Sequence, residues 1–422
     1  MAVLWLGLSA GLARAHGGFP LPTGALLDGQ GGDPLVTTTF GLLLPTGNGP
    51  RFHWVCEEAV GGNLTNAVLW ARSPTGTVLA GGRAGAWRFS ESRCGLTRPS
   101  GVTEMDRVRA VAAHPTQPMF ALGVGMGDVR VSLDDGRTFE PTALAINSVL
   151  PGSLLLDGDP QSYRLLVVWR FLSDGHAELE LSTAGQPAPR VVLPDPRAAA
   201  WELVAWDPAN AGWVYVRENG DTVDRLLRVN TADGATTVLR EAEDDLFLAV
   251  HPDGQRVAHG GLRSVLQVSV NGGAQVVDRA TVRQVRALRW GANNTLHVAA
   301  DNWNDGFAAG MSADDGVTWT GLGRFVDIEG VLSCPSGEVN DVVTQCAQYW
   351  PSLMMLFGIR PDGGPMPAGD AGTTPPPDPD PPGCPNCAQA APQVGLLVLL
   401  WALRQWRARR NAVVTRPGPG TC

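Results

Sequence analysis

The sequence predicts an all-β protein built as a β-propeller, and three observations support this fold class. A short phrase recurs at steps of 38 to 50 residues through the middle of the chain. Apolar or alternating runs of strand length lie between its copies. Gly (52 residues) and Pro (33 residues) are abundant, which suits many short strands joined by turns. A repeat of this length indicates small antiparallel sheets that bury their faces against neighbouring units.

The recurring phrase is Ser-x-Asp-x-Gly-x-Thr followed by an aromatic residue. Its strong copies are SLDDGRTF (132–139) and SADDGVTW (312–319), and weaker copies align on the glycine. The anchor positions fall near residues 49, 94, 136, 185, 235, 273 and 316. Seven anchors predict seven blades, with six or eight as the alternatives because several copies are worn.

A Pro-bearing turn precedes most anchors and marks a second point in each unit. The examples are Ser73-Pro74, His114-Pro115, Asp159-Pro160, Asp207-Pro208 and His251-Pro252. Strand-like runs such as YRLLVVW and LHVAAD follow between turn and anchor. We therefore expect several short strands per unit. His114 and His251 occupy the same place in their units, which indicates a repeated structural turn.

The phrase resembles the Asp-box, or BNR repeat, of the sialidase-like (exo-alpha-sialidase) and related propellers. In that family the box is the turn between the third and fourth strands of a blade, on the side away from the usual binding face. An Asp in such a turn accepts backbone N–H bonds, a Gly supplies backbone freedom and an aromatic ring fills apolar space. The resemblance implies a structural role for Ser132, Asp134, Gly136, Thr138, Phe139, Ser312, Asp314, Gly316, Thr318 and Trp319.

The propeller is expected over residues 36–360, after an N-terminal segment at 16–35. Strands from about 327 to 350 are expected to join those of 36–57 and close the ring. Residues 1–15 form an apolar run that ends in Ala13-Arg14-Ala15, the pattern of a cleaved secretory signal peptide. The alternative is a buried N-terminal strand or helix.

The C-terminal region divides into a Pro/Gly/Asp-rich linker (361–386), a Cys-hydrophobic-Arg segment (387–410) and a tail (411–422). This order of parts resembles the MYXO-CTERM sorting tail of myxobacteria and their relatives. The resemblance implies processing by a myxosortase-type protease, a lipid on Cys387 or Cys384, with Cys387 preferred, and display on the bacterial cell surface or outer membrane. A plain C-terminal membrane anchor is the alternative, although the apolar run is short for a bilayer span.

Four cysteines lie in the exported domain, and an even set in an oxidising compartment predicts disulfides. We expect Cys334 to pair with Cys346 across a short loop, and Cys56 with Cys94 by elimination.

Several classes of chemistry are excluded or disfavoured. The chain has no Lys, so no lysine Schiff base or P-loop lysine is possible, and a net charge of −9 argues against nucleic acid as a partner. No HExxH, GxSxG, Walker or dinucleotide motif is visible. The loop at Asp301–Gly306 departs from the calcium-binding pattern at Trp303 and Ser312. We expect no cofactor and no metal.

The expected function is a non-catalytic propeller that binds a surface protein or glycan. A sialidase-like glycoside hydrolase is the first alternative, and a structural envelope protein is the second. The sialidase resemblance would imply three Arg on a substrate carboxylate, a Tyr–Glu nucleophile pair and an Asp acid. The Phe-Arg-Ile-Pro signature is absent and the only tyrosines are Tyr163, Tyr215 and Tyr349, so no catalytic residue is assigned.

Overall fold

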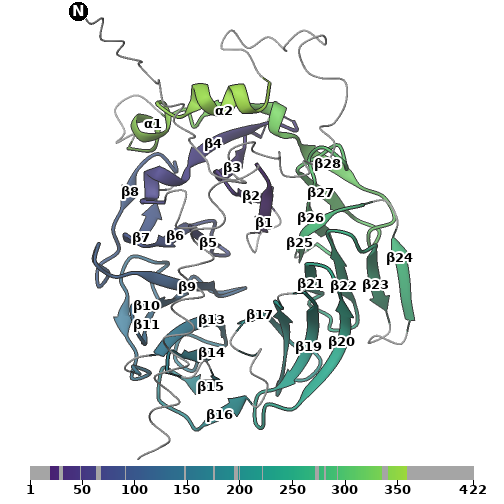
Figure 1. The fold of residues 1–422 in the computed structure, drawn as a ribbon. Helices are drawn as coiled ribbons and strands as arrows, with labels where there is room; N and C mark the ends of the chain where they lie inside the picture. The colour runs from purple at the N-terminus through teal and green to yellow at the C-terminus, as the bar shows by residue number, and fades with distance from the viewer. Residues whose placement is uncertain are drawn as a thin grey trace, which may run out of the picture. The chain divides into compact units, whose positions relative to one another are not determined.

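The strands form a ring of seven sheets around a central axis (Figure 1). The computed structural model describes residues 20–358, except 28–31, 48, 63–67, 91, 147–148, 174–175, 194–197, 199, 221, 271–274, 280–281, 292 and 335–340. Within these residues the expected all-β, seven-bladed propeller is confirmed. The predicted signal peptide and its cleavage site, the linker, Cys384, Cys387 and the tail lie outside the described residues.

Six blades are four-stranded antiparallel meanders whose strands follow chain order from the axis outward. Blade 2 contains β5 (Leu69–Arg72), β6 (Val78–Gly82), β7 (Gly85–Phe89) and β8 (Leu96–Thr97), and blade 3 contains β9 (Val108–Ala113), β10 (Phe120–Val124), β11 (Asp128–Ser132) and β12 (Glu140–Pro141). Blade 4 contains β13 (Val149–Asp157), β14 (Arg164–Phe171), β15 (Ala177–Thr183) and β16 (Arg190–Leu193), and blade 5 contains β17 (Trp201–Trp206), β18 (Trp213–Glu218), β19 (Asp224–Asn230) and β20 (Thr236–Ala242). Blade 6 contains β21 (Leu246–Val250), β22 (Val257–Gly261), β23 (Leu266–Val270) and β24 (Gln275–Arg279), and blade 7 contains β25 (Val285–Trp290), β26 (Leu296–Ala300), β27 (Ala309–Ser312) and β28 (Thr320–Gly323).

The repeat pattern in the sequence corresponds to this architecture. Each predicted anchor falls between the third and fourth strands of a blade, and each Pro-bearing turn falls between the first and second. The strand-like runs in the sequence are the second strands of the blades. Strands β6, β10, β22 and β26 are buried along their whole length, because both faces pack against neighbouring blades. This explains why they read as continuous apolar runs without alternation.

The first blade closes the ring with both ends of the domain. It contains β1 (Pro22–Leu26), β2 (Leu35–Thr38), β3 (Gly41–Pro45) and β4 (Phe52–Cys56), with β29 (Ile328–Val331) as a fifth strand parallel to β4. The expected closure is therefore confirmed, but two boundaries were wrong. The blade begins at Pro22 instead of residue 36, and the strands expected up to residue 350 end at Val331.

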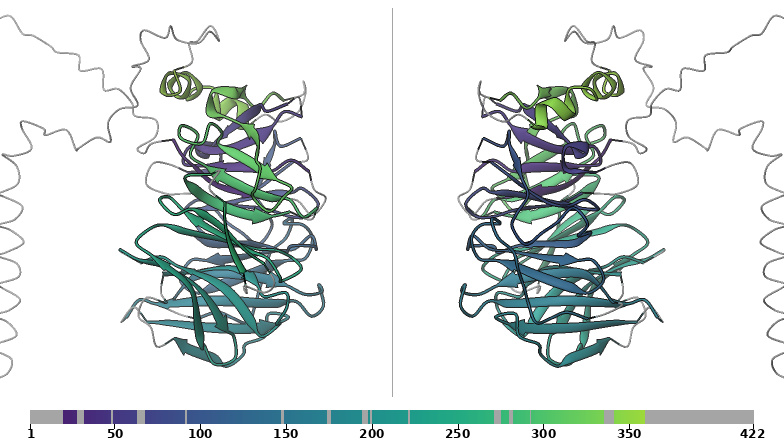
Figure 2. Two further views of the ribbon diagram at one scale, coloured as in Figure 1. Left: turned by 90° about the vertical axis from the view of Figure 1, so that its right-hand side faces the viewer. Right: turned by 90° about the vertical axis from the view of Figure 1, so that its left-hand side faces the viewer.

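Two short helices replace the strands expected after Val331. They are α1 (Asp341–Cys346) and α2 (Trp350–Leu356), and both lie at the outer side of the first blade (Figures 1 and 2). Val342, Cys346, Leu353 and Phe357 face the apolar cluster of that blade. Their spacing has the period of a helix, so burying them on one side requires helices and not a strand.

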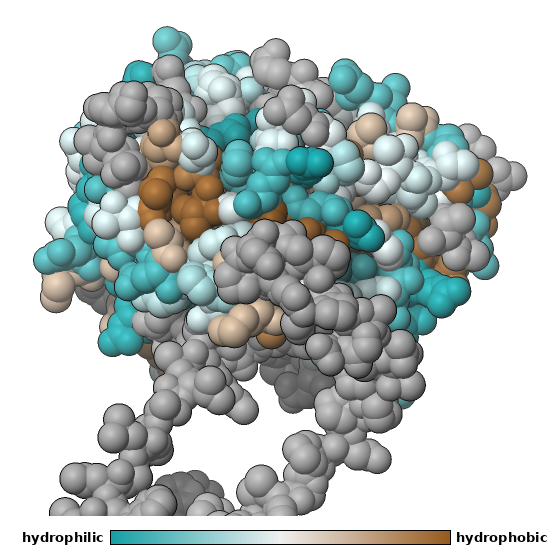
Figure 3. Space-filling view, turned by 90° about the horizontal axis from the view of Figure 1, so that it is seen from above, coloured by the Kyte–Doolittle hydropathy of each residue, from teal (hydrophilic) through white to brown (hydrophobic). Residues whose placement is uncertain are grey.

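Apolar side chains of the helical segment are also exposed on this rim. Met355 and Leu356 at the end of α2 are 64% and 47% exposed. Figure 3 views the rim from the side of the helices and shows a compact group of hydrophobic residues at the left, with smaller hydrophobic areas at the centre and right among hydrophilic ones. Neither helix of the described chain has the length and hydropathy needed to cross a membrane.

Glycines in equivalent positions of the second strands let neighbouring blades approach closely. A Cβ on Gly123 of β10 would lie 2.7 Å from the ring of Pro151 in the next blade, and one on Gly81 would lie 2.6 Å from Val108. Packing of this kind sets the spacing between blades.

We expect Gly123→Ala to destabilise the domain by about 1–3 kcal/mol, because the added methyl group meets a rigid proline ring. Urea unfolding of the variant and the wild type measures the difference. Gly82→Ala is the matched control, since a Cβ there would have no atom within 4 Å. Equal losses in the two variants would show that backbone entropy and not blade spacing determines the effect.

Candidate functional site

The central channel of the ring is the candidate site. It encloses a cavity of about 340 Å³ lined by the innermost strand of every blade. The innermost strands run in the same direction along the axis, because each blade repeats the same meander, and their C-terminal ends meet at the face that carries the Pro-bearing turns and the anchor turns. On β5, β9, β13 and β25 the lining residues come mainly from the later part of the strand, and they include Trp70–Arg72, Val111–Ala113, Leu154, Leu155 and Ala287–Arg289. On β17 and β21 they come instead from the earlier part of the strand, as Glu202 and Phe247 do, so the cavity crosses the channel obliquely.

Aromatic and charged side chains occur together in the channel wall. Arg217 lies over the ring of Phe247, with its Cζ 4.2 Å from the ring centroid. Its two terminal nitrogens each lie 3.5 Å from a carboxylate oxygen, one of Glu202 and one of Asp224. Asp224 also accepts the backbone N–H of Leu246 at 3.1 Å, which fixes its position. Arg217 is thus held in place and its charge is balanced.

Arg72 and Arg289 stand at the ends of the two strands that flank β1. Arg72 is buried and donates from Nη1 to the carbonyl oxygens of Asp33, at 3.0 Å, and Leu26, at 3.4 Å. Arg289, opposite His297 in the β25–β26 ladder, has no hydrogen-bond or ion-pair partner among the described residues. Enclosure by the ring lowers the pKa of its guanidinium, although the side chain remains accessible to solvent in the channel.

This channel site was not among the residues predicted from the sequence. Apart from Arg217 on β18, its residues lie on or next to first strands that carry no recurring phrase, and the ring brings them together from positions far apart in the chain. The two basic residues inside an otherwise apolar strand, Arg286 and Arg289 in VRALRW, are the signal that could have indicated Arg289.

The residues of the two strong repeats form the third-to-fourth turns of blades 3 and 7, which we call the Asp-box turns (132–139 and 312–319). In each turn the Ser hydroxyl donates to the Asp carboxylate and accepts the Gly N–H, while the Thr N–H and hydroxyl donate to the Asp. The N–H of Thr318, with the hydroxyls of Thr318 and Ser312, lowers the pKa of Asp314 to about 2. Phe139 is buried between blades 2 and 3, and Trp319 packs beside the cluster of blades 6 and 7.

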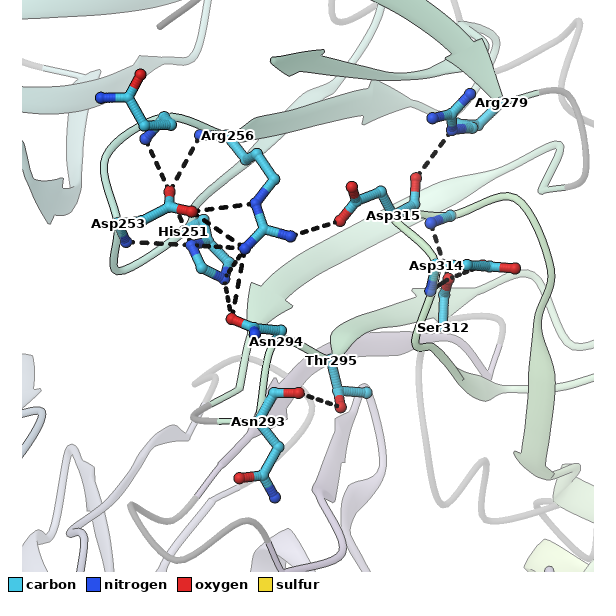
Figure 4. A network of polar contacts seen from close by, with 12 residues as sticks. His251, Asp253, Arg256, Arg279, Asn293, Asn294, Thr295, Ser312, Asp314 and Asp315 are labelled. Atoms are coloured by element: carbon cyan, nitrogen blue, oxygen red, sulfur yellow. Dashed lines mark hydrogen bonds and ion pairs between the residues drawn. The ribbon is translucent and has the colours of Figure 1, made fainter. Parts of the chain in front are cut away.

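The second acid of each Asp-box turn ties its blade to the preceding one. Asp315 accepts from Nη1 of Arg256 at 2.9 Å, and its carbonyl oxygen accepts from Nε of Arg279 at 2.9 Å (Figure 4). Asp135 makes the same kind of link, accepting from Thr75 at 3.0 Å, while its carbonyl oxygen accepts from Nε of Arg88 at 2.9 Å. Both aspartates adopt positive φ angles, 56° and 61°. The contact was not predicted, although the Asp-Asp doublet in both copies is a sequence signal that could have indicated it.

We expect Asp315→Asn to lower the free energy of unfolding by about 1–2 kcal/mol, because Arg256 loses a charged acceptor. Asn tolerates the left-handed backbone, so the substitution tests the charge without added strain. Chemical denaturation at low and high salt measures the effect, which should shrink as salt screens the pair. Asp233→Asn, in an exposed turn of blade 5, is the control; an equal loss there would contradict the interblade role.

Both predicted disulfide pairings were wrong, although all four cysteines are bonded. The disulfides join Cys56 to Cys346 and Cys94 to Cys334, with Cα–Cα distances of 5.4 and 5.7 Å. Cys56 ends β4, and α1 packs against that strand, which brings Cys346 to it. Cys94 lies in the β7–β8 turn of blade 2, beside the residues that follow β29. Pairing the two cysteines that are nearest in sequence gave the wrong partner, because ring closure makes the two ends of the domain neighbours.

The acidic loop residues and the turn histidines that the sequence singled out make hydrogen bonds to the backbone of loops and turns. Asp301 accepts the N–H groups of Trp303 and Asn304 within its loop, and Asp305 accepts those of Arg283 and Gln284. No group of three potential metal-ligating side chains occurs in the described ranges. The imidazole Nδ1 of His114 accepts two backbone N–H bonds in its turn, and that of His251 accepts one, which confirms the repeated turn.

The comparisons with known proteins find similar folds but no family. No protein-family model matches the sequence, and no curated protein matches it. Among solved structures, a GH74 enzyme from Niastella koreensis is 15% identical over 72% of this chain, with a TM-score of 0.47; the chain covers 54% of that structure, about half its length. The WD40 repeats of RRP9 are 13% identical over 68% of this chain and 89% of their own, with a TM-score of 0.48. The Dos1 propeller is 10% identical, with coverages of 70% and 81% and a TM-score of 0.47. These likenesses concern the propeller architecture and carry no assignment of function.

Proposed function

We propose that this protein is a binding module of the bacterial cell envelope, a non-catalytic propeller that holds a protein or glycan ligand at its central channel. The channel carries the proposal. It is lined from all seven blades, it contains aromatic and charged side chains, and it includes Arg289, which has no partner among the described residues. Concave sites with a few polar groups in an apolar wall are typical of ligand pockets, and 340 Å³ lies within their usual range of about 300–1,000 Å³.

Export and surface display are part of the proposal. The two disulfides are consistent with an oxidising compartment. The signal peptide, processing by a myxosortase-type protease at Cys387 or Cys384, and attachment through a lipid or the C-terminal tail rest on the sequence alone. We also propose an Asp-box propeller of the sialidase-like type, supported by the shared hydrogen bonds of the two Asp-box turns.

A sialidase-like glycoside hydrolase is the second candidate. The presence of Arg72, Arg217 and Arg289 in one channel favours it, since several arginines suit a carboxylate-bearing sugar. The tyrosines favour the binding module instead. Tyr163 and Tyr215 are buried in apolar clusters and Tyr349 precedes α2, so none of the three lines the channel cavity.

The deciding experiment presents the purified full-length chain to fluorogenic sialosides and other glycosides, and to immobilised envelope glycans and proteins. The binding module predicts saturable, competable binding without turnover. Turnover abolished by a single carboxylate or Tyr substitution would replace it with the hydrolase. A folded protein with neither property would leave a structural envelope protein.

A further inference from the structure

The position of Arg289 defines one end of the channel. It is the penultimate residue of β25, and Arg72 is the last residue of β5. Because the innermost strands share one direction, both arginines lie toward the face that carries the Asp-box turns. This is the face opposite to the one that the family resemblance would favour for binding.

The charges in the channel are unequally balanced. Arg217 lies between Glu202 and Asp224, and Arg286 of the same strand as Arg289 lies 3.5 Å from Asp301. Arg289 alone among these three has neither an acid nor a hydrogen-bond acceptor among the described residues. Arg72, the other arginine of the lining, donates to the carbonyl oxygens of Asp33 and Leu26, so Arg289 is the arginine of the cavity wall whose donors have no acceptor among the described residues.

Arg289 is exposed in the channel and its N–H donors have no acceptor among the described residues, so an anion that enters the channel can pair with its guanidinium group. The guanidinium group matches a carboxylate with two parallel N–H···O bonds. One guanidinium with unpaired donors offers a single two-pronged site, which suits a monoanion, and Glu202 in the same channel repels additional negative charge. Trp70, Leu155 and Phe247 in the lining suit an apolar or aromatic body attached to the anionic group.

We propose that the Arg289 end of the channel binds a small organic monocarboxylate, with its carboxylate on the Arg289 guanidinium and its apolar part against the aromatic wall. The proposal rests on the channel being the binding site, and it adds the ligand class and the end of the channel at which the charged group lies.

The first test measures stability without ligand. Arg289→Gln is expected to leave the melting temperature of the full-length chain unchanged in buffer free of carboxylates, because the side chain is exposed in the channel and has no partner among the described residues to lose. Arg263→Gln, an exposed side chain in the β22–β23 turn, is the matched control and should leave the melting temperature unchanged. A lower melting temperature in Arg289→Gln alone would assign Arg289 a structural role and overturn the proposal.

The second test titrates sodium benzoate, with neutral benzamide and inorganic phosphate as comparison probes, by calorimetry. We expect wild-type protein to bind benzoate in preference to both, Arg289→Gln to lose at least about tenfold in affinity, and Arg263→Gln to bind as wild type. Arg289→Lys should be intermediate, since it keeps the charge and loses the planar fork. Equal benzoate binding by Arg289→Gln, tighter binding of phosphate, or absence of benzoate binding would each overturn the proposal.

The two proposals fail separately. If the wild-type chain binds an envelope glycan or protein and Arg289→Gln binds it equally well, the carboxylate site is wrong and the binding module stands. If the chain binds neither envelope components nor benzoate, both proposals fail.

Discussion

Replacing Cys56 and Cys346 together with alanine should cost the domain on the order of 4–5 kcal/mol of unfolding free energy at 25 °C. This disulfide joins residues 290 positions apart, and closing so long a loop removes much of the conformational entropy of the unfolded chain. It also fastens α1 to the end of β4, so its loss should release the helical segment from the first blade before the ring itself opens. The expected fall in melting temperature is about 5–10 °C.

Urea unfolding of the double variant measures the loss, and Cys94→Ala/Cys334→Ala is the matched comparison, because its loop of 240 positions predicts nearly the same entropy term. Peptide mapping of the wild type without reductant checks the connectivity. A Cys334–Cys346 crosslink would contradict it, since that pairing closes only a short loop and would leave the first two blades unlinked to the C-terminal segment.

The parts of the fold that repeat could be predicted from sequence. Turn chemistry is local, so Asp134–Gly136 and Asp314–Gly316 in one phrase specify the same turn wherever it occurs. All seven anchor positions therefore fall between a third and a fourth strand, including the worn copies near residues 49 and 94.

The parts that depend on closing the ring could not be predicted in this way. The partner of Cys56 depends on where α1 packs, and the neighbour of β4 is a strand more than 270 residues later. Val342, Cys346, Leu353 and Phe357 have the spacing of a helix in the sequence. The repeat period of the blades predicted strands there instead, because it was extended beyond the last repeat. The channel is similar, since Arg72, Arg217 and Arg289 belong to no common motif and only the ring places them in one cavity.

Acidification from pH 7 to pH 4 should destabilise the propeller through two buried histidines. Burial lowers the pKa of His259 to about 4, and the neighbouring Arg240 acts in the same direction. Burial also lowers the pKa of His297 to about 4, against a smaller opposing effect of Asp33. Both side chains are less than a tenth exposed, so little solvent is available to stabilise their charged forms.

The direction follows from proton binding. In the unfolded chain both histidines take up protons near pH 6.5, whereas in the folded ring they resist protonation until about pH 4. Between these values the unfolded state binds more protons, so stability is full above about pH 6.5 and falls as the pH approaches 4. Each histidine should contribute on the order of 2–3 kcal/mol to this loss.

His259→Gln/His297→Gln should have a much flatter stability profile across this window, even if it is less stable than wild type at pH 7. His176→Gln, a half-exposed histidine on blade 4, should keep the wild-type slope. Guanidinium unfolding at half-unit steps from pH 7.5 to 4 gives the slopes directly. Asp314 does not complicate the comparison, because its pKa of about 2 keeps its turn charged throughout the window. A double variant that loses stability as steeply as wild type would show that other groups, and not these histidines, carry the acid sensitivity of the ring.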